Sequence, residues 1–166
     1  MKLAKVKSIA DKISAQAQKL LERDSCLYPV FFSINKDGTL KPVMINLEGE
    51  RKKDVLIDML EYYAAESEAM IVLIDSWILE TENDAVIPES LENCKDACSA
   101  IVCIAYMKDA SALRRLAYEK KGVRYSFADL GWSNVGPGEM MQSRLENPYW
   151  KKPLYKVQRN DDGEFK

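Results

Sequence analysis

The spacing of apolar residues predicts a helix at the start of the chain. Over residues 3–21 apolar side chains recur three and four positions apart, which is the period of one helix face. This seam consists of Leu3, Val6, Ala10, Ile13, Ala17 and Leu20. The seam spans fewer than three heptads and contains two alanines, too little for a coiled coil. We therefore expect the stripe to pack on the protein's own sheet.

The next segment predicts a β-hairpin. Residues 28–34 are rich in β-branched and aromatic side chains, and residues 35–38 (Asn-Lys-Asp-Gly) have turn composition. Residues 39–47 then return as a second strand. Pro42 lies in that strand and has no N–H to donate, so we expect the strand to have a free edge.

A second helix and a central strand are expected next. Residues 50–67 have helical periodicity, and residues 69–79 form the clearest strand of the chain. Its first six residues are apolar on both faces, as a buried central strand requires. Alternation then places Asp75 and Trp77 on the same side of that strand.

The C-terminal half predicts a meander. A strand is expected over residues 99–107, whereas residues 111–120 suit either a strand or a helix. We favour the strand, which gives three adjacent strands within residues 99–130. A loop over 131–138 and a short helix over 139–145 are expected to follow.

The order α-β-β-α-β-(loop)-β-β-β predicts an α+β fold. We expect a single domain over residues 1–156, with a largely antiparallel sheet of five to six strands. The N-terminal helix and the second helix are expected to pack together on one face of that sheet. The loop is the acidic connection over residues 80–96, and residues 157–166 form a polar tail that frays.

Composition fits a soluble protein with a sizeable core. The chain has 166 residues, of which 47% are hydrophobic. Its apolar runs, such as residues 69–74, are much shorter than the roughly 20 residues that a membrane span needs. The first residues alternate charged with apolar side chains, which is unlike a signal peptide. We therefore expect a cytoplasmic protein with no membrane partner.

The chain contains no histidine, which closes the usual routes to acid–base catalysis and to metal binding. Its cysteines are Cys26, Cys94, Cys98 and Cys103, and their spacing matches no zinc or iron–sulfur pattern. We expect reduced thiols, no metal and no cofactor. No nucleophile and base are singled out, so catalytic residues are not assigned and the balance favours a protein that is not an enzyme.

Charge is segregated along the chain although the formal net charge is only −2. Residues 1–24 carry six basic and three acidic side chains. Residues 54–98 carry twelve acidic side chains and one basic one, and residues 144–159 carry five basic and one acidic. Such asymmetry indicates either an interaction surface or simply a solvated one.

Asp75 and Trp77 form the first candidate site. An acid that shares a face with a tryptophan at the end of a buried strand can lie at the rim of a pocket, with a raised pKa. The simpler interpretation is that Asp75 caps a loop N–H while Trp77 covers the edge of the core.

Basic and aromatic residues around the predicted hairpin form the second candidate. Arg114, Arg115, Tyr118 and Tyr125 belong to this group, which loosely suits single-stranded nucleic acid. The sequence pI near 5.4 argues against that function, so nucleic acid is not our expected partner. Basic side chains on a hairpin also deter edge-to-edge aggregation.

The third candidate interleaves aromatic with basic side chains near the C-terminal end. It comprises Tyr149, Trp150, Lys151, Lys152 and Tyr155. Such a segment suits docking to a partner, for instance to the acidic 54–98 region of another copy. Equally, the aromatic rings can fold back as a cover on their own domain.

Three functions follow from these candidates. The leading hypothesis is a non-enzymatic module that binds protein, including itself as a homodimer. The first alternative is a histidine-free enzyme or small-molecule binder near Asp75 and Trp77. The second is single-stranded nucleic-acid binding through residues 113–127.

Overall fold

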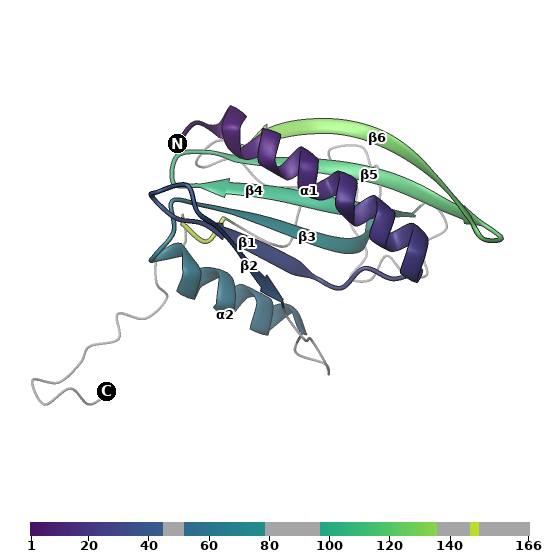
Figure 1. Cartoon of the computed structure of the whole chain (residues 1–166), viewed down its shortest axis with the longest axis horizontal. Coiled ribbons are helices and arrows are strands. Elements are labelled where there is room, and N and C mark those ends of the chain that lie inside the picture. Colours follow the sequence, from purple (N-terminus) through teal and green to yellow (C-terminus); the bar gives the residue numbers. More distant parts are fainter. Residues whose placement is uncertain (45–51, 79–96, 136–146, 150–166) are drawn as a thin grey trace, which may run out of the picture.

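The computed structural model describes residues 1–44, 52–78, 97–135 and 147–149. Its elements follow the predicted order (Figure 1). They are α1 (Leu3–Asp24), β1 (Val30–Ile34), β2 (Leu40–Met44), α2 (Lys52–Ala64), β3 (Ala69–Ile78), β4 (Cys98–Met107), β5 (Ser111–Lys121) and β6 (Arg124–Val135). The strands form one antiparallel sheet in the order β2-β1-β3-β4-β5-β6. The predicted α+β class is confirmed.

The central position of β3 explains its apolar composition. Ile71 and Leu73 point to the side of the sheet that α1 covers, which we call the α1 face. Met70 and Val72 point to the opposite side, the α2 face. Both sets are buried because each face has a helix over it.

The prediction that both helices share one face was wrong. α1 packs on the α1 face through Val6, Ala10 and Leu21, whereas α2 packs on the α2 face through Leu56 and Leu60. The physical reason lies in the strands, which are apolar on both sides. Two helices on a single face would leave the other apolar layer in water, at a cost of roughly 25 cal/mol for each Å² exposed.

The buried stripe of α1 packs on the sheet as expected, but it ends on a different residue. Leu21 is 1% exposed, whereas Leu20, the predicted last member of the seam, is 40% exposed. A straight helix turns every 3.6 residues, so its stripe drifts away from a strict seven-residue repeat. Ser14 replaces an apolar residue in the stripe, and its hydroxyl donates to the Ala10 carbonyl at 2.8 Å.

The predicted β1–β2 hairpin is confirmed. Asp37 accepts a hydrogen bond from the Thr39 N–H, and Gly38 takes a φ of 83°, which suits a residue without a Cβ. Pro42 lies on β2, the outer strand of the sheet, and pairs in register with Phe32 of β1. An edge position removes the need for the N–H that proline lacks.

The meander over β4, β5 and β6 is also confirmed, and residues 111–120 are strand. One boundary differs from the prediction, because Gly131 and its neighbours up to Val135 continue β6 instead of starting a loop. Figure 1 shows the β5–β6 hairpin extending past the end of α1.

Several predicted features lie outside the described residues. They are the acidic connection 80–96, the short helix 139–145, the frayed tail 157–166, and the candidate residues Trp150, Lys151, Lys152 and Tyr155.

Candidate functional site

Two candidates that lie far apart in the sequence meet on the α1 face. Trp77 on β3 pairs with Ser99 on β4, which pairs in turn with Tyr118 on β5. Asp75 lies two residues before Trp77 and therefore on the same side of β3. The Tyr118 hydroxyl reaches across β4 and donates a hydrogen bond to the Asp75 carboxylate at 2.8 Å.

Further aromatic rings extend this group along β6. Phe127 pairs directly with Tyr118, and the two ring centroids are 6.0 Å apart. Tyr125 lies 5.8 Å from Tyr118 and stacks on Phe127 at 6.3 Å. We call the set Asp75, Trp77, Tyr118, Tyr125 and Phe127 the aromatic face. Strand alternation builds it, because side chains two residues apart share a side of the sheet.

Asp75 is an acid in a partly apolar setting. Removal of its carboxyl group from water raises its pKa, and the hydrogen bond from Tyr118 opposes that rise. The same surroundings and the neighbouring carboxylate raise the pKa of Tyr118, so its hydroxyl stays protonated as the donor. The raised pKa that the sequence suggested for Asp75 therefore has a physical cause in the structure.

No lysine or arginine forms an ion pair with Asp75 within the part of the chain that the structure describes. The nearby Lys120 is directed elsewhere. Its ammonium lies 5.5 Å from the centroid of the Tyr125 ring and contacts the Ser25 hydroxyl at the end of α1. Asp75 thus presents a carboxylate beside aromatic rings without a counterion from these residues.

Exposure makes the aromatic face accessible. The Trp77 side chain is 44% exposed, although tryptophan is normally among the better buried residues. Tyr118, Tyr125 and Phe127 are half-buried, with their lower sides against the core. Rings that already pack against the core on one side, with the other side in solvent, lose little conformational entropy when a partner covers them.

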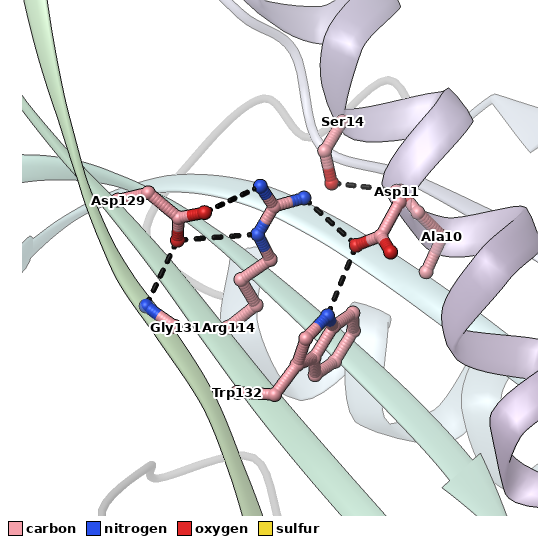
Figure 2. Close-up of polar contacts among 7 residues, drawn as sticks. All are labelled: Ala10, Asp11, Ser14, Arg114, Asp129, Gly131 and Trp132. Carbon is pink, nitrogen blue, oxygen red and sulfur yellow. Dashed lines mark hydrogen bonds and ion pairs between the residues drawn. The ribbon is translucent and has the colours of Figure 1, made fainter.

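Arg114, another predicted binding residue, has a structural role (Figure 2). Its guanidinium donates to both carboxylate oxygens of Asp129, at 3.3 and 2.8 Å, and to Asp11 of α1 at 2.8 Å. The Trp132 indole N–H donates to the same Asp11 oxygen at 3.0 Å. These bonds tie α1 to β5 and β6, and the hydrogen bond from Arg114 lowers the pKa of Asp129.

A β-bulge creates that geometry. On β6, Leu130 and Gly131 together oppose Arg115, so one extra residue is inserted into the strand. Residues three apart normally face opposite ways, but the insertion turns Asp129 and Trp132 to the same side. Gly131 takes a φ of 76°, and its N–H donates to Asp129 at 2.8 Å.

The predicted basic cluster is divided between the two faces of the sheet. Arg114 pairs with Cys103 and points to the α1 face, whereas Arg115 pairs with Val102 and points to the α2 face. Consecutive residues of a strand alternate in direction, so these two arginines do not share a surface. Arg115 also has a buried Nε with no hydrogen-bond partner among the described residues.

Tyr149 folds back on the domain. Its hydroxyl is 2.9 Å from the Ser67 hydroxyl, just before β3, and its ring packs against the α2-face core. Asn147 is buried and donates from its amide to the Met107 carbonyl and the Ser111 hydroxyl, both at 2.8 Å. For Tyr149 the cover interpretation is therefore the one that fits.

Cys103 is an unreactive thiol among the described cysteines. Burial raises the pKa of Cys103 to about 12, so it carries almost no thiolate near neutral pH. Cys26 is exposed and Cys98 partly so, and both are free thiols. Within the described ranges, no group of three or more acidic or cysteine side chains is placed to hold a metal ion.

No known protein family, curated protein or solved structure matches this chain. Neither of the two described helices is both long enough and apolar enough to cross a membrane. The function must therefore be argued from the geometry of the site.

Sequence reasoning found part of this site and missed the rest. It singled out Asp75, Trp77, Tyr118 and Tyr125, but as two unrelated candidates. The alternation of Tyr125 with Phe127 was a signal that both rings share a face with each other. No comparable signal linked Asp11 to Trp132, because 121 residues separate them and a bulge sets the direction of Trp132.

Proposed function

We propose that this protein is a non-enzymatic module that binds protein chains through the aromatic face. The observation that supports this most directly is the meeting of an exposed Trp77 with the Asp75–Tyr118 hydrogen bond on one rigid surface. Tryptophan and tyrosine are the residues that contribute most at protein interfaces, since they combine large apolar area with a polar group.

The chemistry of the aromatic face selects a basic partner side chain. Asp75 carries a negative charge with no counterion in the described residues, and aromatic ring faces attract cations. A lysine or arginine set among apolar residues satisfies both features at once. We therefore assign to the partner a basic segment that also carries aromatic or aliphatic side chains.

The alternative functions have less support. Nucleic-acid binding through residues 113–127 loses two of its basic groups, because Arg114 is held in ion pairs and Arg115 points to the other face. Catalysis has less support because the raised pKa of the Tyr118 hydroxyl keeps it protonated beside Asp75, and Cys103 is a buried neutral thiol. A small ligand with a positive charge remains compatible with Asp75 and Trp77 and is an outcome of the test below.

Binding to an array of short random peptides tests the proposal. We expect the bound peptides to be enriched in lysine or arginine next to aromatic or aliphatic residues. The variants Asp75→Asn and Trp77→Ala should each weaken that binding roughly tenfold, the equivalent of about 1.4 kcal/mol.

Matched control variants lie on α2, on the other side of the sheet. Asp58→Asn and Tyr62→Ala remove an exposed acid and a 65% exposed aromatic ring there, and both should bind like the unaltered protein. The proposal fails if no basic peptide binds, or if the control variants weaken binding as much as the variants of the aromatic face. Selective binding of small ammonium compounds in place of peptides would favour the small-molecule alternative.

A further inference from the structure

The chain itself contains a segment with the chemistry that the aromatic face selects. Residues 150–159 carry four basic side chains, no acidic one, and the aromatic rings of Trp150 and Tyr155. Lys151 and Lys152 follow Trp150 directly. A partner built in this way supplies cations for Asp75 and an aromatic ring to stack on Tyr118 or Tyr125.

The position of Tyr149 disfavours contact between these lysines and Asp75 of the same chain. The Tyr149 hydroxyl is held at Ser67, two residues before β3 begins, and the Tyr149 ring lies on the α2 face. Asp75 lies six residues along β3 from Ala69, about 20 Å away at roughly 3.3 Å per residue. Lys152 follows Tyr149 by three residues, which span at most about 11 Å. The path would also have to pass around an edge of the sheet.

A second copy of the chain has neither restriction. We infer that the aromatic face receives residues 150–152 of another copy, with an ammonium group of Lys151 or Lys152 at the Asp75 carboxylate and Trp150 against the rings. A two-fold axis makes the exchange reciprocal, so each copy gives a segment and accepts one. This inference rests on the proposed function and names the partner as the protein itself.

Light scattering behind size exclusion, on the full chain, provides the first measurement. We expect a dimer at low salt that dissociates as salt is added, because added ions screen the lysine–carboxylate attraction. The variants Asp75→Asn and Lys151→Gln/Lys152→Gln should each weaken dimerisation about tenfold. The control Lys19→Gln/Lys36→Gln removes the same charge from two exposed positions elsewhere and should dimerise normally.

Mixing the two defective variants gives the sharper test. The Asp75→Asn chain still offers its lysines, and the Lys151→Gln/Lys152→Gln chain still offers Asp75. The mixture should therefore form a heterodimer with one intact contact, although neither variant dimerises well alone. Defects at two positions that do not contact each other in the dimer would not be rescued by mixing. Absence of the heterodimer would therefore overturn the inference.

A synthetic peptide of residues 150–159 separates this inference from the proposed function. Added to the full-length Lys151→Gln/Lys152→Gln chain, it should shift the NMR signal of the Trp77 indole, and Asp75→Asn in that chain should abolish the shift. If the peptide does not bind while basic peptides from the random array do, the inference is wrong and the proposed function stands. If neither binds, both are wrong.

Discussion

Tyr118 donates a hydrogen bond to Asp75 from two strands away, at an O–O distance of 2.8 Å. Tyr118 is in register with Trp77, two residues beyond Asp75, so its side chain must cross β4 diagonally to make the contact. The bond fixes the ring next to an acid that has lost part of its hydration. Asp75 is therefore held partly out of water, with a hydrogen bond from Tyr118 but without an ion pair to a lysine or arginine among the described residues.

At neutral pH, without a partner, the Asp75→Asn variant should be at least as stable as the unaltered protein. Any gain in the free energy of unfolding should be no more than about 0.5 kcal/mol. The pKa of Asp75 is raised in the folded state, so its ionised form opposes folding above the unfolded pKa. The unaltered protein regains that stability as pH falls through the folded pKa. An asparagine oxygen still accepts the Tyr118 hydrogen bond.

Thermal unfolding of both proteins as a function of pH checks this prediction. The difference in stability should be largest near neutral pH and should disappear below about pH 3, where the carboxyl group is protonated in both the folded and the unfolded state. A clear loss of stability in the asparagine variant at pH 7 would mean that Asp75 is a structural acid, as a strand-end cap would be.

Arg114→Met should lower the free energy of unfolding by about 2 kcal/mol. The arginine side chain is only 15% exposed, and its loss leaves Asp11 and Asp129 without the cation that joins them. Arg114→Lys should recover only part of the loss, because a single ammonium does not reproduce the planar fork of the guanidinium. Urea denaturation measures both, and equal stability of the lysine variant and the unaltered protein would contradict this role.

Gly131→Ala should cost about 1 kcal/mol of stability. An added Cβ meets nothing within 4 Å, so crowding is not the cause. The cost comes from a φ of 76°, which residues with a side chain rarely adopt. Gly131→Asn should cost less, because asparagine tolerates this region better. Chemical denaturation of the three proteins should rank them glycine, asparagine, alanine in decreasing stability.

A chain that ends at Tyr149 should fold with near-normal stability, whereas Asn147→Ala in the full chain should lose about 2 kcal/mol. The Asn147 amide satisfies a carbonyl at the end of β4 and the buried Ser111 hydroxyl. Its own side-chain oxygen accepts the Tyr149 N–H at 2.9 Å. Circular dichroism melting compares the two, and equal melting temperatures would contradict a structural role for Asn147.

The candidate site was predicted in pieces. The end of a strand that is apolar on both faces identified Asp75 and Trp77 as residues that leave the core on the same side. The β-rich segments after Met107 identified Tyr118 and Tyr125 as neighbours of each other. Their union with Asp75 depends on β4 lying between β3 and β5, and strand order is a property of non-local pairing. Arg114 was chosen for its charge, whereas its ion pairs depend on the bulge at Gly131.

The sequence by itself determined the features that depend on nearest neighbours. Alternation and helical spacing specified the order of the elements, and the missing N–H of Pro42 placed β2 at an edge. Only the tertiary structure decided which helix covers which face, how the bulge turns Trp132 toward Asp11, and that Tyr118 reaches Asp75. Periodicity tells which side chains share a side of one element. It does not tell what lies opposite, because that follows from how apolar layers are jointly removed from water.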